Sequence, residues 1–199
     1  TLMVEEGYTD YIYLDTGGKY KRPTTGMGHL LANEELEKYN ITGWAWKAIP
    51  NIGKRQVAVT KSDDGKESFV RIDDSVLKKW ASEDTIESYK QAKNDAKQLN
   101  ITDKDFINRL THVNYQQGAD WHWEGRFPGV FKALKDRDWQ EAIENVEWVN
   151  PDTKSDTSDW YSGTPTRAKN FMKAIESLGN RMDRASIIPD EDFIGPPAP

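Results

Sequence analysis

The chain has 199 residues, 36% of them apolar and 30% charged, which is enough for one domain with a sizeable core or for one domain built as two lobes. Its formal net charge of −6 argues against general nucleic-acid binding, and the absence of cysteine excludes disulfides. The sequence shows neither an apolar run long enough to span a bilayer nor a signal-peptide pattern, so no membrane insertion is expected.

The first part of the chain predicts strands and turns. An alternation of aromatic and other residues favours a strand over 8–14, and D-T-G-G at 15–18 is a turn that leads into a second strand over 19–27. Before them, residues 1–6 are expected to end a helix, and residues 33–40 to form a short helix or turn.

A second hairpin is predicted over 54–72. Its strands, 56–60 and 68–72, carry β-branched residues, and S-D-D-G at 62–65 supplies the reversal. We expect this hairpin to be separate from the first one, as an insertion.

From residue 73 onward the apolar spacing is helical. A helix of about 25 residues over 73–98, capped by Asp73 or Asp74, is long enough to connect two lobes. Further helices are predicted at 103–117, 127–135, 138–146 and 165–178, with a loop over 150–164 and a Pro-rich tail or linker over 186–199. The predicted fold class is α+β, mainly α.

Two carboxylates and a threonine near the N-terminus form a candidate site. Hydrolysis of a glycosidic bond needs a proton donor and a second carboxylate, and in inverting enzymes also a positioned water. Glu6, near a helix end, is the candidate for the protonated acid, and Asp15, in a glycine-rich turn, for the carboxylate that stays ionised. Thr24 can hold a water against Asp15. On spacing alone, such a pair among 33 acidic residues is more often simply solvated.

Further motifs follow this stretch in a fixed order. Glu6-Gly7 and T-x-G-x-G-H at 24–29 are accompanied downstream by H-V-N-Y-Q-Q-G at 112–118 and W-Y-S-G-T-P-T-R-A at 160–168. Together they resemble the phage lysozyme family, glycoside hydrolase family 24, and D-W-Q-E-A at 138–142 is similar to one of its helix starts. The resemblance covers roughly residues 1–35 and 73–178.

The resemblance implies a muramidase that hydrolyses the β-1,4 bond between N-acetylmuramic acid and N-acetylglucosamine in bacterial peptidoglycan, with no cofactor and no metal. It implies that Glu6 is the general acid, that Asp15 is the base or charge stabiliser, and that Thr24 positions the attacking water. Gln116 and Thr164 match substrate-binding positions that line the family's cleft.

Two more residues match positions near that cleft. His29 matches a histidine that can line the substrate site; we expect it to be structural, holding the hairpin by hydrogen bonds. Arg167 matches an arginine that pairs with the catalytic glutamate and ties the lobes together.

The implied fold is a two-lobed lysozyme domain over 1–185. Its small N-terminal lobe would carry the β-hairpin over about 1–72, the helix over 73–98 would connect the lobes, and a helical lobe would follow over 99–185. W-H-W at 121–123 is interpreted as loop packing or cleft wall, since three histidines without a cysteine are weak support for zinc.

The chain departs from the family pattern in one spacing. Eight residues, 16–23, separate Asp15 from Thr24, which is longer than the family's segment. The extra residues must bulge out, or Thr25 takes the role given to Thr24. The widened spacing also leaves room for a rival function, a catalytically impaired wall-binding or structural module of a phage particle.

The acidic charge bears on partners and location. A freely diffusing endolysin profits from attraction to an anionic wall, whereas tethering on a virion supplies local concentration without it. We therefore expect a phage virion or tail lysozyme with peptidoglycan and other virion proteins as partners. The alternative is an endolysin held in the host cytoplasm until its release to the periplasm and wall.

Overall fold

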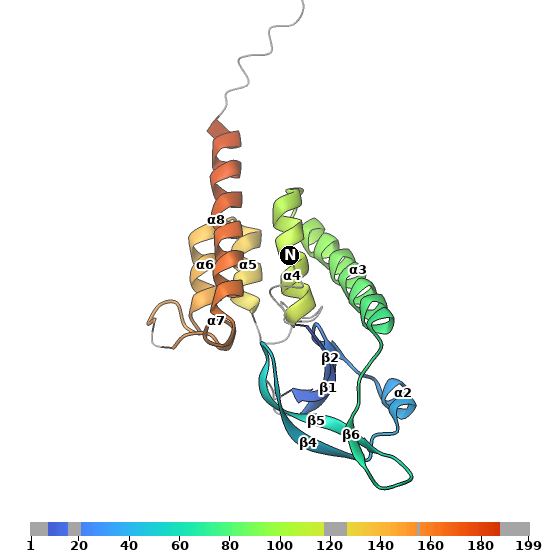
Figure 1. Ribbon diagram of the computed structural model, residues 1–199. Helices are drawn as coiled ribbons and strands as arrows, with labels where there is room; N and C mark the ends of the chain where they lie inside the picture. Colours follow the sequence, from blue (N-terminus) through green and yellow to red (C-terminus); the bar gives the residue numbers. More distant parts are fainter. Residues whose placement is uncertain (1–7, 16–20, 118–126, 155, 188–199) are drawn as a thin grey trace, which may run out of the picture. The chain divides into compact units, whose positions relative to one another are not determined.

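The computed structural model describes residues 8–15, 21–117, 127–154 and 156–187 (Figure 1). The chain divides into two compact units, Thr1–Glu87 and Ser88–Pro199. An antiparallel sheet occupies the first part of the chain and helices follow it, so the α+β class predicted from the sequence is correct.

The sheet of the first unit has six strands in the order β3-β2-β1-β5-β4, with β6 paired to β5 beside this path. All its strand pairs are antiparallel. The strands are β1 (Thr9–Asp15), β2 (Arg22–Gly26), β3 (His29–Leu30), β4 (Gly43–Ile49), β5 (Gly53–Lys61) and β6 (Glu67–Phe69).

Alternation along β1 gives the sheet two apolar faces. Tyr11 and Tyr13 pack with Val57 of β5 in one buried cluster. Ile12, which points the other way, packs with Ala58 and with Leu77 of helix α3 (Asp74–Gln98) in a second cluster. Because both faces are apolar, a slip of one residue in the register of β1 would place each side chain in the wrong cluster.

The turn from β2 to β3 explains the two glycines of the T-G-M-G-H motif. Gly26 and Gly28 have φ values of 59° and 101°, which favour glycine over any residue with a side chain. The Gly28 N–H donates to the carbonyl oxygen of Thr25 at 3.0 Å and closes the turn. The motif therefore has a local structural role.

The expected short helix over 33–40 is present as α2 (Asn33–Leu36) and the 3₁₀ helix η1 (Glu37–Tyr39). The predicted hairpin over 54–72 is also present, as β5 and β6, with Gly65 at φ 80° in its turn. The expectation that it is separate was wrong. β5 pairs with both β1 and β4, so this hairpin belongs to the same sheet as the first one.

The second unit is helical. Its core is formed by apolar side chains from every one of its described helices and from the end of α3. The helices are α4 (Lys104–Gln117), α5 (Pro128–Asp136), α6 (Trp139–Glu147), α7 (Asp159–Gly163) and α8 (Pro165–Ile187). Among the largest fully buried side chains here are Phe106, Leu110, Leu134, Phe171, Ile175 and Leu178.

Two helix predictions need correction. The segment 150–164, expected to be a loop, contains the short helix α7, whose first turn is capped by Ser158 Oγ accepting from the Tyr161 N–H at 3.1 Å. The last helix was expected to end before Gly179, yet α8 continues to Ile187. Gly179 is buried and lies against Trp139, since a Cβ at residue 179 would lie 2.7 Å from the Trp139 ring.

Candidate functional site

Asp15 and Thr24 lie on the same face of the β1–β2 hairpin. The register pairs Asp15 with Arg22 and Tyr13 with Thr24, and paired residues share a face. Asp15 and Thr24 are therefore diagonal neighbours, which in antiparallel pairs are about 7–8 Å apart. Thr24 is only 2% exposed, and its hydroxyl donates to the Arg22 carbonyl at 3.1 Å.

Thr25, the alternative to Thr24, points to the opposite face. It pairs with His29 of β3 and is fully buried. Its hydroxyl has no hydrogen-bond partner among the described residues. The register thus puts Thr24, and not Thr25, on the face of Asp15.

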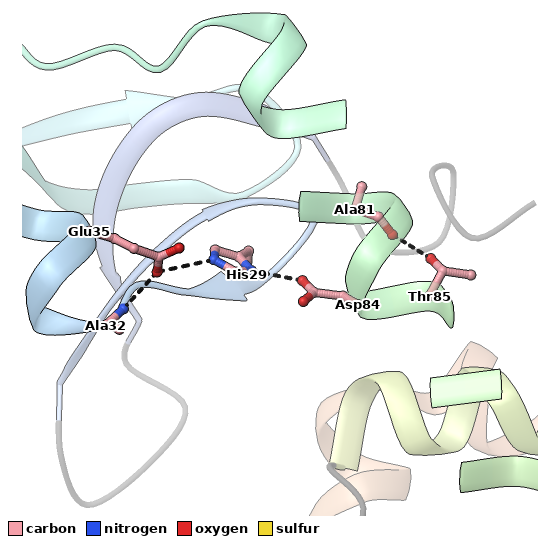
Figure 2. Close-up of polar contacts among 6 residues, drawn as sticks. All are labelled: His29, Ala32, Glu35, Ala81, Asp84 and Thr85. Atoms are coloured by element: carbon pink, nitrogen blue, oxygen red, sulfur yellow. Dashed lines mark hydrogen bonds and ion pairs between the residues drawn. The ribbon is translucent and has the colours of Figure 1, made fainter. Parts of the chain in front are cut away.

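His29 is held by side chains of two helices of the first unit (Figure 2). Its Nδ1 lies 2.8 Å from the carboxylate of Asp84 on α3, and its Nε2 lies 3.4 Å from the carboxylate of Glu35 on α2. The ring stacks on Trp80, with 4.5 Å between centroids and 10° between planes. The same Glu35 oxygen accepts from the Ala32 N–H at 2.9 Å, so one carboxylate joins β3 to the start of α2.

The surroundings of His29 favour its charged form. Burial lowers the pKa of the imidazole, but the hydrogen bond and charge of Asp84 and the charge and hydrogen bond of Glu35 outweigh burial. The net result is a pKa raised above the usual 6.5. Both ring nitrogens therefore face carboxylates of the fold.

Three of the downstream residues meet in the second unit. The Trp160 indole N–H donates to the side-chain oxygen of Gln116 at 3.3 Å. Arg167 approaches the same amide. In the other orientation of this amide its oxygen accepts from the Arg167 guanidinium Nε at 3.2 Å instead of from Trp160, so the two hydrogen bonds are alternatives. The two motifs that lie 44 positions apart in sequence therefore converge on one amide.

Thr164 lies where α7 passes into α8. Its hydroxyl donates to the Trp160 carbonyl at 3.0 Å, and its own carbonyl accepts from the Arg167 N–H at 3.0 Å. These bonds give the T-P-T-R motif a local role, since they cap one helix and start the next.

Several expected features fall outside the described residues. Glu6, the helix end expected over 1–6, the D-T-G-G turn beyond Asp15 and the W-H-W segment at 121–123 all belong to this group.

Sequence reasoning missed the partners of two site residues. Asp84 lies one helical turn after Trp80, and both reach His29 from α3. That spacing was visible in the sequence, but nothing in it pointed to a histidine 55 positions earlier. Trp160 was part of a motif, yet its hydrogen bond to Gln116 could be found only in three dimensions.

No family model matches this sequence, and none of the curated proteins searched is significantly similar to it. Within the described ranges, no group of three or more His, Cys, Asp or Glu side chains could hold a metal ion. The helices described in the structure are each too short or too polar to cross a bilayer.

Proposed function

We propose that the protein is a muramidase that hydrolyses the β-1,4 bond between N-acetylmuramic acid and N-acetylglucosamine of bacterial peptidoglycan. The observation that carries the proposal is the register of the β1–β2 hairpin, which brings Asp15 and Thr24 to one face although eight residues separate them. A carboxylate and a hydroxyl on one face, far enough apart for a water between them, are what an inverting glycosidase needs to hold and deprotonate that water.

In the proposed mechanism Glu6 protonates the leaving oxygen. Asp15 accepts a proton from the water that Thr24 orients, and it stabilises the positive charge that develops on the sugar ring. Inversion at the anomeric carbon follows if the Glu6 and Asp15 carboxyl groups stand about 6.5–9.5 Å apart. A two-lobed lysozyme-like fold, with Gln116 and Thr164 contacting the glycan and Arg167 pairing with Glu6, is part of the same proposal.

The contacts of His29 support a structural role for it in this mechanism. A general base needs a ring nitrogen free to reach the substrate or its water. Here Asp84 occupies one nitrogen and Glu35 faces the other, while Trp80 covers the ring. His29 therefore fixes β3, the strand paired to Thr24, in place.

The clearing of outer-membrane-permeabilised cells tests this function. Glu6→Gln is expected to lower the clearing rate by at least about 100-fold, the usual effect of losing a general acid. Thr24→Val is expected to lower it as well, whereas Thr25→Val, an equally buried matched control, is expected to leave the rate unchanged. Circular dichroism of each variant verifies folding.

Two outcomes would contradict the assignment. Equal clearing by the native chain and Glu6→Gln would remove the role given to Glu6. No clearing by the native chain, together with sedimentation of the chain with purified walls, would favour the non-enzymatic wall-binding module. NMR of fresh product reports the anomeric configuration, and retention would contradict the inverting mechanism.

We also propose that this muramidase acts while tethered to a phage particle. With a net charge of −6, the free chain gains nothing from the anionic wall, and attachment supplies the local concentration instead. The clearing rate of the isolated chain is then expected to rise or stay level as salt screens the repulsion. A rate that falls steeply with salt would contradict this.

A further inference from the structure

An open pocket of about 590 Å³ lies in the first unit, between the start of β1, the end of β4 and the segment that leads into α3. Its volume is within the range of small-ligand sites in proteins. Aromatic, cationic and acidic side chains line it together. They include Tyr8, Asp10, Tyr11, Lys47, Arg71 and Asp74.

Two cations in this pocket flank one aromatic ring. The Lys47 ammonium lies 4.9 Å from the centroid of Tyr11 and 4.4 Å from that of Phe69. The Arg71 guanidinium lies 4.8 Å from the Tyr11 centroid, and its Nη2 donates to the Tyr11 hydroxyl at 2.5 Å. These contacts hold both positive groups at the wall of the pocket.

The carboxylates of the pocket are engaged with other cations. Asp10 pairs with Arg71 at 3.2 Å. Asp74 pairs with Lys78, one turn further along α3, and accepts a hydrogen bond from Tyr8. Among the described residues, the Lys47 ammonium has aromatic contacts but no carboxylate partner. Of these two cations, Lys47 is therefore the one whose charge is available to bind an anion.

Tyr8 adds a neutral ring to this surface. Burial and the hydrogen bond to Asp74, together with the charges of Asp74 and Asp10, raise the pKa of its phenol to about 12. The phenol thus stays uncharged at neutral pH and adds no repulsion toward an anion. With 36% of the residue exposed, its ring can pack against the apolar face of a sugar.

We propose that this pocket binds the carboxylate of a muramyl saccharide, with the carboxylate on Lys47 and the sugar ring against Tyr8. The inference rests on the proposed function for the identity of the saccharide, and it extends that function by naming a subsite. The shared chemistry is a carboxylate attached to a pyranose. It can come from the lactyl group of bare muramic acid or from a stem peptide.

Three soluble probes separate these sources. In two-dimensional ¹H–¹⁵N NMR titrations of the full chain, N-acetylmuramic acid is expected to shift the amide signals of Tyr8, Tyr11 and Lys47. N-acetylglucosamine, which lacks the carboxylate, is expected to bind more weakly. Muramyl dipeptide, whose carboxylate is on the peptide, shows by its relative affinity which source the pocket prefers.

Lys47→Gln removes the charge and keeps a polar side chain of similar reach. It is expected to weaken binding of the acidic probe roughly three- to fivefold and to leave N-acetylglucosamine unaffected, as for a partly exposed charge pair. Lys38→Gln, the same change at an exposed residue of η1, is the matched control and is expected to change neither affinity.

Three outcomes would each overturn the subsite. They are equal affinity for acidic and neutral sugars, an unchanged affinity of Lys47→Gln for the acidic probe, and NMR shifts confined to residues outside the pocket. These titrations do not depend on turnover. Cell clearing that requires Glu6, combined with no binding in the pocket, would refute the subsite alone. Binding of the acidic sugar by a chain that never clears cells would refute the muramidase alone.

Discussion

Replacement of Asp84 by Asn tests whether His29 is held as a cation. The change keeps the size of the side chain but removes the negative charge that lies 2.8 Å from His29 Nδ1. Nothing else in the described structure pairs with this carboxylate. The predicted effect is a loss of stability that depends on pH.

The size of this loss of stability follows from how far the two side chains are exposed to solvent. The side chains of His29 and Asp84 are 16% and 33% exposed, so the pair is neither dry nor fully solvated. Hydrogen bonds to charged groups contribute about 1.5–3 kcal/mol when well shielded, and exposed ion pairs less than about 1 kcal/mol. We therefore expect Asp84→Asn to cost about 1–2 kcal/mol of unfolding free energy at pH 5.5.

The pH dependence has a definite direction. The folded-state pKa of His29 is raised, so the contribution of its charge is complete below the unfolded-state value of 6.5 and is lost as the pH rises through the folded-state value. Above that range the neutral ring keeps only an ordinary hydrogen bond to Asp84. The cost of Asp84→Asn should thus shrink by more than half at pH 9.

Urea denaturation at both pH values measures this cost, and NMR titration of the His29 ring gives its pKa directly. Asp63→Asn, the same change in the exposed β5–β6 turn, is the matched control and should cost nothing at either pH. The reasoning fails if native His29 titrates at or below 6.5, or if Asp84→Asn costs the same at pH 5.5 and pH 9.

Two further changes test packing in the second unit. Gly179→Ala places a Cβ 2.7 Å from the Trp139 ring. We therefore expect it to lower the unfolding free energy measured in urea by about 1–3 kcal/mol, despite the better helix propensity of alanine. Gly163→Ala, with open space around it, is the control and should be neutral or slightly stabilising. Trp160→Phe removes the larger ring of a buried indole and the contact of its N–H with the Gln116 amide and should cost about 1–2 kcal/mol. Trp46→Phe, at a residue 60% exposed, should cost almost nothing. Equal effects within either pair would refute the packing described.

The local pattern of apolar and polar residues was sufficient to predict most helices and strands. The alternation over 8–14 predicted β1, and apolar spacing with Asp74 near the start predicted α3 closely. Strand β4 was missed, although Trp44, Trp46 and Ala48 alternate with smaller or polar residues there. That signal was available but brief, and only pairing with β5 makes the segment a strand.

Other features depended on contacts distant in sequence. The place of the β5–β6 hairpin is set by its pairing with β1, more than 40 positions away. Helix α8 continues past Gly179 because Trp139 packs there, and only a residue without a Cβ leaves space for the Trp139 ring. A local rule that ends helices at glycine gave the wrong boundary here, since tertiary packing outweighed intrinsic propensity.

The choice between Thr24 and Thr25 shows most clearly what sequence spacing cannot decide. A hairpin fixes which residues share a face by its register, and the length of the connecting segment leaves that register open. The pairing of Asp15 with Arg22 places Thr24 beside Asp15, while a slip by one residue would place Thr25 there. The two apolar clusters that Tyr13 and Ile12 enter from opposite faces oppose that slip. The core of the first unit, and not the spacing within the motif, therefore selects the threonine that lies on the face of Asp15.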